Sequence, residues 1–165
     1  MLSPALRALA ITLRPKSADD AAFLERLYIE TRWDELTVAS WPDSVKRDFL
    51  RSQFALQTRH YADHYAEASF AIVELHGQPV GRLYLHRGTR EIRIVDISLL
   101  AERRGQGIGG ALLRWVGGEA AAGGRIVSIH VEQFNPALTL YRRLGFQDKD
   151  VRGPYLLMEW APVRS

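Results

Sequence analysis

The sequence has no cysteine and no long hydrophobic run. The absence of cysteine excludes disulfide bonds, thiolate metal sites and a cysteine nucleophile, and it is typical of proteins in a reducing cytoplasm. No apolar run approaches the roughly 20 residues of a membrane span. The apolar stretch at the N-terminus is short and interrupted by Arg7, so it does not resemble a signal peptide. We therefore expect a cytoplasmic protein with no membrane partner.

The remaining composition is that of a globular domain. Of the 165 residues, 47% are hydrophobic and 25% are charged, which excludes a disordered or collagen-like chain. A chain of this length is typical of one domain with its own core, so we expect residues 1–165 to form a single domain. The basic residues are dispersed without interleaved aromatic residues, which disfavours nucleic-acid binding.

The net charge of +3 is unevenly distributed along the chain. Residues 15–75 contain 7 basic and 11 acidic side chains, whereas residues 76–165 contain 13 basic and 8 acidic ones. This division would suit a protein with one cationic and one anionic ligand. An uneven scatter of solvated charge is the simpler explanation.

Hydrophobic periodicity predicts a mixture of strands and helices. Alternating or β-branched runs indicate strands, and apolar residues at 3.6-residue spacing indicate helices. The segment His76-Gly77-Gln78-Pro79 is a turn signal between two strands. We expect strands at residues 10–14, 69–75, 80–85, 91–100 and 125–131 and on both sides of 152–154, and helices beginning near 17, 41, 108 and 135. This order is typical of an α/β or α+β sheet protein.

The most informative segment is the glycine-rich turn at residues 101–110, between a predicted strand and a predicted helix. Glycine lets backbone N–H groups face a ligand without obstruction by a Cβ atom. At a helix N-terminus the unpaired N–H groups and the helix dipole favour an anion. Arg103 and Arg104 add formal positive charge. The turn is therefore predicted to bind a pyrophosphate.

Two motifs fit this turn. Gly105, Gly107 and Gly110 satisfy the dinucleotide pattern G-x-G-x-x-G, and Glu132 follows 22 residues later. However, five residues separate the predicted strand core from the first glycine, and the 55 residues after Gly110 are too few for the rest of a dinucleotide fold. Residues 104–109 also satisfy R-x-x-G-x-G, which we favour.

With this second motif, the sequence resembles the GNAT N-acetyltransferase superfamily along nearly its whole length. Residues 104–109 resemble the coenzyme A loop of that family, residues 96–99 its fourth strand, and residues 135–146 its N-x-x-A/L-x-x-x-Y-x-x-x-G-F segment. The resemblance implies an α/β (α+β) fold with a mixed, mostly antiparallel central sheet flanked by helices, in which strands 4 and 5 splay apart. It also implies an acetyltransferase that uses acetyl-CoA as acyl donor and needs no metal.

The resemblance assigns residues to cofactor binding. The loop backbone would hold the pyrophosphate, and edge backbone groups of Ile97 and Leu99 would pair with the pantetheine arm. Asn135 would contact the cofactor as well as cap a helix. The loop residues assigned in this way are Arg104, Gly105, Gln106, Gly107, Ile108 and Gly109.

Tyr141 matches the family position that protonates the departing thiolate. A phenol, with a pKa of about 10, is still protonated at neutral pH and can do this. The alternative role for Tyr141 is that of a core aromatic residue on an amphipathic helix.

The general base is less clearly indicated. The family's strand-4 glutamate position holds Arg93, and Glu91 lies two residues away on the same strand face. The strand-5 position holds His130, whose ordinary pKa of about 6.5 allows it to accept a proton near neutrality. We favour His130, supported by Glu132, over Glu91, and solvent is a third alternative. In a regular strand, Asp96 would point to the face opposite Glu91.

The resemblance implies an amine-bearing acceptor, either a small molecule or a peptide, and a monomer or homodimer. Trp33, Glu35 and Trp41 lie in the region that forms the acceptor wall in this family, and the acidic charge of residues 15–75 suggests a cationic amine. A non-catalytic module that binds acyl-CoA as a sensor is the alternative function. His60 and His64, at i and i+4, lack a third metal ligand and predict only a solvated helix face.

Overall fold

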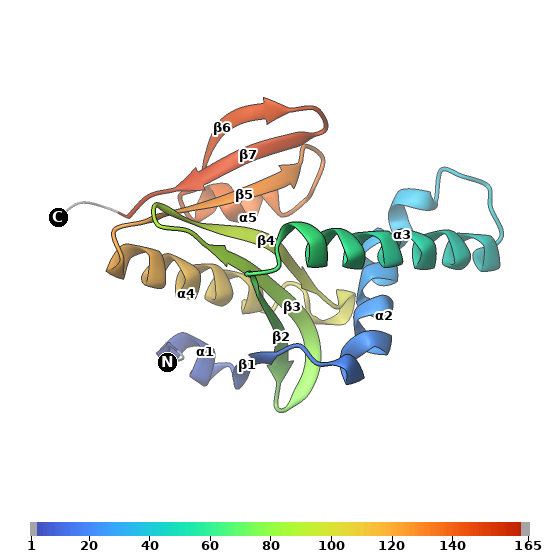
Figure 1. Ribbon diagram of the computed structural model, residues 1–165, viewed down its shortest axis with the longest axis horizontal. Helices are drawn as coiled ribbons and strands as arrows, with labels where there is room; N and C mark the ends of the chain where they lie inside the picture. The colour runs from blue at the N-terminus through green and yellow to red at the C-terminus, as the bar shows by residue number, and fades with distance from the viewer. Residues whose placement is uncertain (1–2, 163–165) are drawn as a thin grey trace.

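A single seven-stranded sheet runs through the computed structural model, which describes residues 3–162 (Figure 1). The strand order is β1-β2-β3-β4-β5-β7-β6, and within the described residues every neighbouring pair is antiparallel except β4 and β5, which are parallel. This confirms the predicted mixed, mostly antiparallel sheet. The strands are β1 (Ile11–Pro15), β2 (Ser69–Leu75), β3 (Gln78–Arg87), β4 (Glu91–Leu99), β5 (Ile126–Glu132), β6 (Gln147–Arg152) and β7 (Tyr155–Trp160).

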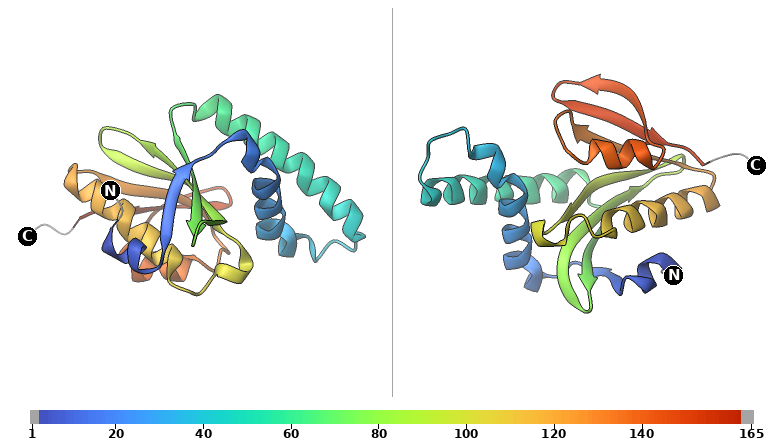
Figure 2. Two further views of the ribbon diagram at one scale, coloured as in Figure 1. Left: turned by 90° about the horizontal axis from the view of Figure 1, so that it is seen from below. Right: turned by 180° about the vertical axis from the view of Figure 1, so that it is seen from behind.

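Helices cover both faces of the sheet (Figure 2). α2 and α3 lie over one face, here called the α3 face, and α1, α4 and α5 lie over the other, here called the α4 face. In residues 3–162, each helix is too short or too polar to serve as a membrane span. The helices are α1 (Pro4–Ala8), α2 (Ala21–Arg32), α3 (Asp43–His64), α4 (Ile108–Ala122) and α5 (Leu138–Arg143), with 3-10 turns η1 (Ala18–Asp20), η2 (Trp33–Leu36) and η3 (Ala101–Arg103).

The main hydrophobic core lies on the α4 face. Leu83 and Leu85 of β3 point into it, and Leu112 and Val116 of α4 pack against them from above the sheet. Full burial of such a side chain contributes about 1.5–3 kcal/mol. Because side chains alternate along a strand, Arg82 and Tyr84 of β3 are left on the α3 face, where they are also buried.

The two short helices differ from the sequence prediction. α1 was not predicted, although Ser3 and Pro4 form a helix start in which the Ser3 hydroxyl accepts a hydrogen bond from the Leu6 N–H. α5 begins at Leu138 and not directly after Asn135. The Asn135 side chain accepts a hydrogen bond from the Ala137 N–H at 2.9 Å and so closes a turn before the helix.

Asp20 fixes the connection between β1 and α2. Its carboxylate accepts hydrogen bonds from the Arg14 guanidinium at 2.9 and 2.7 Å and from the Ser17 N–H at 2.8 Å. These bonds, that of Arg14 above all, lower the pKa of Asp20 to about 2 from its ordinary value of 3.8. The ion pair therefore stabilises the fold above about pH 4, and this contribution is lost as the pH falls through about 2.

We expect Asp20→Asn to lower the unfolding temperature at neutral pH. The difference from the wild type should shrink as the pH falls from about 4 towards 2, because protonation then removes the same charge from the wild type. Thermal denaturation followed by circular dichroism measures this difference. Asp19→Asn, at an exposed neighbouring carboxylate, is the matched control and should change little. A difference for Asp20→Asn that stays constant over the whole pH range would contradict this role of the ion pair.

Candidate active site

The pairing of β4 and β5 ends part-way along the two strands, and the region between their unpaired edges is here called the cleft. The two parallel strands are paired only from Glu91 opposite Ile126 to Ile94 opposite Ile129. Beyond these pairs β4 continues to Leu99 and β5 to Glu132, and within the described residues neither strand pairs with the other there. This confirms the predicted separation of the fourth and fifth strands. Backbone polar groups on the facing edges are thereby available to a ligand.

A β-bulge in β4 lies at the start of this cleft. Leu85 of β3 pairs with Ile94 and Tyr84 pairs with Asp96, so Val95 is an extra residue on β4. The extra residue returns Asp96 to the α3 face, which it shares with Glu91 and Arg93. The prediction that Asp96 faces away from Glu91 was therefore wrong, because it assumed a regular strand.

Asp96 is the centre of a buried polar network on the α3 face. It accepts hydrogen bonds from Arg82 Nη2 at 2.7 Å, from the Tyr61 hydroxyl at 3.1 Å and from the Ser98 hydroxyl at 2.6 Å. Burial raises the pKa of Tyr61, which keeps its hydroxyl a donor. In a hydrogen-bonding network of this kind each side chain limits the movement of the others. Arg82 of β3 and Tyr61 of α3 therefore hold Asp96, and with it the bulge, in place. Sequence reasoning missed this network.

The glycine-rich turn connects the end of β4 with α4. Gly105 and Gly107 have φ values of +73° and +85°, in the left-handed region that favours glycine, and Gly107 is the N-cap of α4. At both glycines the space that a Cβ atom would occupy is open. The Arg104 Nε donates a hydrogen bond to the Leu99 carbonyl at 3.2 Å, which ties the turn to the end of β4. The first-turn N–H groups of Ile108 and Gly109 point out of the helix end, as at any helix N-terminus.

The other residues predicted to bind the cofactor lie around the same cleft. Ile97 and Leu99 are on β4 beyond its last pair with β5, and their side chains pack against the core of the α4 face. Gln106 donates a side-chain hydrogen bond to the Glu102 carbonyl at 3.0 Å. Asn135 lies in the turn after β5. The predicted binding residues therefore share the end of the sheet at which β4 and β5 separate.

Tyr141 lies on α5, behind the cleft on the α4 face. Its side chain is 5% exposed, and its ring centre lies 5.8 Å from that of Phe146. Burial raises the pKa of Tyr141 to about 12, and the negative charge of Asp96 acts in the same direction. The phenol is therefore fully protonated at neutral pH and can only donate a proton.

His130 lies on β5 just past the last pair with β4, on the α3 face. Burial lowers its pKa below the ordinary value of 6.5, and the positive charges of Arg93 and Arg152 lower it further. The imidazole is therefore neutral at physiological pH and able to accept a proton. Glu91, the second candidate base, lies 3.5 Å from the Arg93 guanidinium, whose Nε also donates to the Ser128 hydroxyl at 3.3 Å.

Glu132 does not support His130 through a direct contact. Its carboxylate accepts a hydrogen bond from Arg32, at the end of α2, at 2.6 Å. Arg32 also pairs with Glu35 at 3.2 Å, and its guanidinium lies 5.6 Å from the centre of the Tyr28 ring. Arg32 thus joins α2 to the end of β5 beside the cleft. The sequence contains no signal for this contact, since the partners are 100 residues apart.

Of the three residues predicted to contact the acceptor, Trp33 and Glu35 lie in η2. Glu35 is held by Arg32 near the end of β5, whereas the Trp33 ring lies under the charged groups of Lys46 and Arg47. Trp41 packs against Phe49, with ring centres 5.5 Å apart, at the start of α3. Figure 1 shows that this end of α3 extends away from the sheet.

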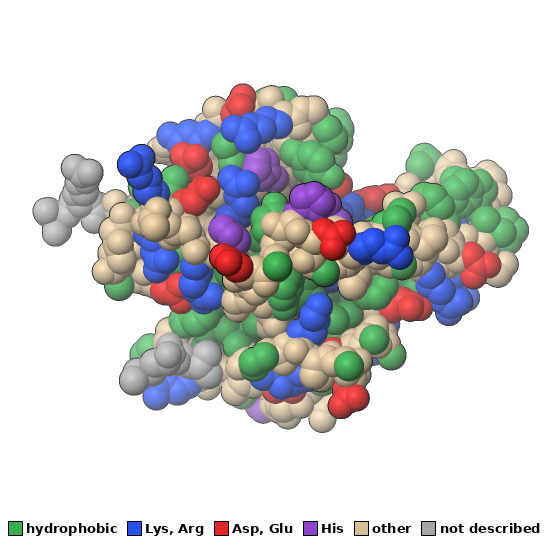
Figure 3. Space-filling model, viewed as in Figure 1, with side chains coloured by type: hydrophobic (Ala, Val, Ile, Leu, Met, Phe, Trp, Pro, Cys, Tyr) green, Lys and Arg blue, Asp and Glu red, His purple; other side chains and the backbone are tan. Residues whose placement is uncertain are grey.

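Histidine side chains gather on the α3 face between α3 and the β5 half of the sheet (Figure 3). The rings of His60 and His64 are stacked with centres 4.2 Å apart, and His86 lies near Tyr65. In the part of the chain that the structure describes, no group of three or more His, Asp or Glu side chains has the arrangement of a metal site. His60 and His64 are both exposed, which agrees with the solvated helix face that was predicted.

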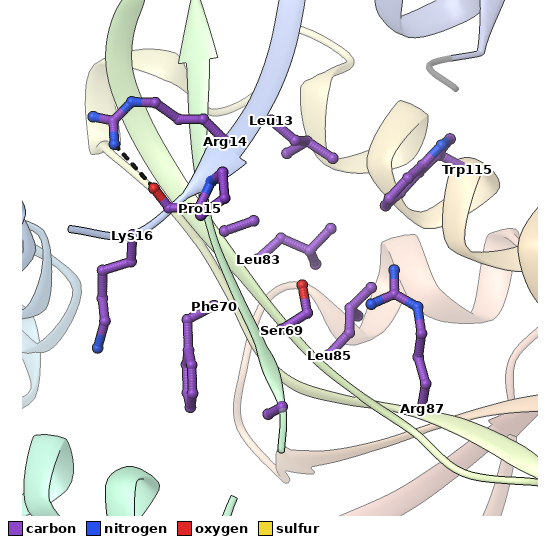
Figure 4. Close-up of a pocket in the computed structure, with 12 residues that line it drawn as sticks. Leu13, Arg14, Pro15, Lys16, Ser69, Phe70, Leu83, Leu85, Arg87 and Trp115 are labelled. Carbon is purple, nitrogen blue, oxygen red and sulfur yellow. Dashed lines mark hydrogen bonds between the residues drawn. The ribbon is translucent and has the colours of Figure 1, made fainter. Parts of the chain in front are cut away.

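Two hollows lie outside the cleft. The larger, of about 490 Å³, is on the α4 face between the ends of β1 and β2 and is lined mainly by apolar side chains such as Leu13, Leu83 and Trp115 (Figure 4). The smaller, of about 300 Å³, is on the α3 face between η1, α3 and β3. Neither contains a predicted catalytic or cofactor-binding residue.

Residues 66–148 match the family model of the acetyltransferase (GNAT) domain. The chain belongs to the GNAT acetyltransferase family. The match contains the bulged β4, the cleft, the glycine-rich turn and Tyr141. GNAT acetyltransferases act on acyl acceptors that carry an amine, and the family assignment makes this protein an acetyltransferase.

Solved GNAT structures share its fold. The PaiA N-acetyltransferase of Thermoplasma acidophilum, solved in complex with coenzyme A, is 18% identical with a TM-score of 0.69 over 92% of this chain and 99% of that one. An acetyltransferase of Thermus thermophilus is 20% identical with a TM-score of 0.66 over 93% and 98%. Arabidopsis thaliana Naa50, in complex with the bisubstrate analogue CoA-Ac-MVNAL, is 18% identical with a TM-score of 0.61 over 92% and 99%. No curated protein matches the sequence.

Proposed function

We propose that this GNAT protein, as a single domain of residues 1–165, transfers an acetyl group from acetyl-CoA to a primary amine. The observation that carries the proposal is the open end of the β4–β5 pair, which leads directly into the glycine-rich turn and α4. One edge of the cleft offers strand backbone to an amide-containing arm, and its end offers N–H groups to a diphosphate. Two similar structures, PaiA and Naa50, were solved with coenzyme A or a coenzyme A conjugate.

Acetyl-CoA fits the residues around the cleft. The diphosphate would be held by backbone N–H groups of the turn, where the left-handed Gly105 and Gly107 leave open space. The pantetheine amides would pair with β4 at Ile97 and Leu99, as an added strand would. Asn135, in the turn after β5, would contribute its side-chain N–H groups, since only its side-chain oxygen is used by Ala137. The binding residues of this proposal also include Arg104, Gln106, Ile108 and Gly109.

In the proposed reaction the amine attacks the thioester carbonyl directly. The backbone at the β4 bulge would polarise the carbonyl oxygen, because preorganised N–H groups stabilise developing negative charge. As the C–S bond breaks, Tyr141 would protonate the sulfur, and its pKa of about 12 keeps that proton in place until the thiolate forms. The amine must lose one proton, which we assign to His130, directly or through water. Glu91 is the weaker candidate because Arg93 lies beside it.

The pH dependence of the reaction tests the assignment of His130. Its pKa lies below 6.5, so kcat/KM of the wild type should fall on the acidic side of that value as the imidazole becomes protonated. We expect His130→Ala to lose this acidic limb and to lower kcat/KM about 10-fold to 100-fold near neutral pH. Glu91→Gln should keep the limb. A His130→Ala profile with the acidic limb of the wild type would exclude His130 as the base.

A sensor module that binds acetyl-CoA without catalysis is the second candidate, favoured only because we assign cofactor binding and catalysis to different residues. Thiol release from acetyl-CoA, measured with a panel of amines, separates the two functions. An enzyme releases coenzyme A in proportion to added amine, and mass spectrometry finds the acetylated amine. Binding of acetyl-CoA without amine-dependent thiol release for any member of the panel would favour the sensor.

The panel should include cationic, neutral and acidic amines. The acidic charge of residues 15–75 suggested a cationic acceptor, but much of it is paired with arginine: Asp20 and Glu74 with Arg14, and Glu35 with Arg32. At the end of β5, Glu132 shares Arg32 with Glu35. A polyamine or basic peptide that binds at this end of β5 would compete with Arg32 for these carboxylates. The thiol-release rates of the panel members test this directly.

A further inference from the structure

The smaller hollow on the α3 face has the composition of a binding site. It has a volume of about 300 Å³, at the lower end of the range for small-molecule pockets. Its walls come from the segment after β1, from α2, α3 and β3, and include no residue of the β4–β5 cleft. Apolar side chains, among them Leu24 and Phe54, form one part of the wall, and Lys16, Arg82 and Tyr84 form a polar part.

Arg82 supplies a buried cation with one unused donor. It is 3% exposed, and its Nη2 donates to Gln57 at 2.9 Å and to Asp96 at 2.7 Å. Its Nε is buried and has no hydrogen-bond partner among residues 3–162. Both N–H groups of Nη2 are thus used within the chain, and the guanidinium lies 4.9 Å from the centre of the Tyr84 ring. Buried polar groups are almost always paired, and a charged donor forms a strong hydrogen bond with a carboxylate. The unpaired Nε indicates that an acceptor from outside the chain forms the missing hydrogen bond with Arg82.

Lys16 adds a positive charge at the edge of the hollow. Its ammonium lies 4.8 Å from the centre of the Phe70 ring and 5.9 Å from that of Tyr84. Among the described residues it has no carboxylate partner within ion-pair distance, whereas the nearby Asp20 is paired with Arg14. Asp96 balances Arg82, so the charge of Lys16 leaves the hollow positive.

We propose that this hollow binds a small carboxylate whose body is apolar. The carboxylate would accept a hydrogen bond from the Nε of Arg82 and lie near the charge of Lys16, and Leu24 and Phe54 would cover the apolar body. Arg82 and Tyr61 both line the hollow and both hold Asp96 at the β4 bulge. A ligand bound in the hollow would therefore affect the position of β4, the strand that borders the cleft. The site is separate from the proposed catalytic function, since binding can be measured without any reaction.

Benzoate and its neutral isostere benzamide are suitable probes, with binding followed by titration calorimetry or ligand-observed NMR on the full chain. We expect benzoate to bind and benzamide to bind at least about 10-fold more weakly, because only the anion gains the charge-assisted bonds. Lys16→Ala should weaken benzoate binding about 3-fold to 10-fold at low salt. Lys46→Ala is the matched control, since Lys46 makes a similar contact with the Trp33 ring but lies outside the hollow. It should bind benzoate like the wild type.

Three results would overturn the proposal. Benzoate and benzamide with equal affinities, or no binding of either, would exclude recognition of the anion. If Lys16→Ala binds benzoate with the affinity of the wild type, benzoate does not bind in this hollow. Displacement of benzoate by coenzyme A would place the anion in the glycine-rich turn. Arg82→Gln should abolish binding, and Lys16→Ala tests the site without disturbing the buried network because Lys16 is exposed. Lys16 also lines the larger hollow, so Arg87→Ala, which removes a cation of the larger hollow only, is the second control and should bind benzoate like the wild type.

If benzoate competes with the amine acceptor in the thiol-release assay, the natural carboxylate is part of the acceptor. If benzoate changes the rate without raising the KM for the amine, the natural ligand is a separate effector. Each result supports the site and identifies the source of the anion.

Discussion

Tyr141→Phe is expected to lower kcat about 100-fold or more while the KM for acetyl-CoA stays close to that of the wild type. The substitution removes only the hydroxyl, and a positioned general acid contributes about 10²–10⁴ to a rate. The ring, which is buried against Phe146, keeps its packing. Because the pKa of Tyr141 is raised to about 12, the wild-type hydroxyl carries its proton throughout the physiological range. Steady-state kinetics with the best amine of the panel measures the effect.

Tyr65→Phe is the control for this experiment. Tyr65 follows α3 and contacts His86 and Tyr61 on the α3 face, outside the proposed reaction. Its replacement removes a hydroxyl of the same kind and should leave kcat within about 2-fold of the wild type, as expected for a surface substitution. Full activity of Tyr141→Phe would show that solvent or another group protonates the thiolate, and Tyr141 would then be a core residue only.

Gly107→Ala is expected to raise the KM for acetyl-CoA about 10-fold or more. Gly107 is the N-cap of α4 with φ of +85°, and alanine in this conformation costs about 1–2 kcal/mol. The added methyl group would also occupy the open space in front of the N–H groups, where the diphosphate is proposed to lie. A loss of about 1.4 kcal/mol of binding free energy is a 10-fold change in affinity.

Gly77→Ala separates backbone strain from loss of the binding surface. Gly77 lies in the β2–β3 turn with φ of +78°, and the position of its Cβ atom is equally open. Both variants should therefore lose similar stability in thermal denaturation. Only Gly107→Ala should raise the KM. Equal KM values in the two variants would show that the turn does not hold the phosphates.

Much of the site could be predicted because its signals are local. The turn at residues 104–109 and the segment from Asn135 to Phe146 are contiguous motifs, and glycine spacing alone predicts where backbone N–H groups are exposed. The same holds for the strands that alternate in hydrophobicity. Boundaries were less accurate: Asn135 satisfies its side chain in a turn with Ala137, and α5 begins only afterwards.

The long-range contacts on the α3 face were not predicted. The bulge at Val95 depends on how β3 pairs with β4, and this pairing decides which face Asp96 occupies. Arg32 meets Glu132 across 100 residues, and Arg82 becomes buried only because α3 covers its face of the sheet. In each case the partner comes from a distant part of the chain.

The apolar alternation of the strands and the absence of cysteine and of long hydrophobic runs determined, by themselves, a sheet protein held together by its core and not by cross-links. The sequence also determined the glycine-rich turn, because the left-handed φ at Gly105 and Gly107 is a conformation that glycine adopts without strain. The separation of β4 and β5 was expected from the family resemblance, but only the tertiary structure decided the face of Asp96 and the unpaired donor of Arg82. Burial and pairing join segments that are far apart in the chain, and no local pattern encodes which of them meet.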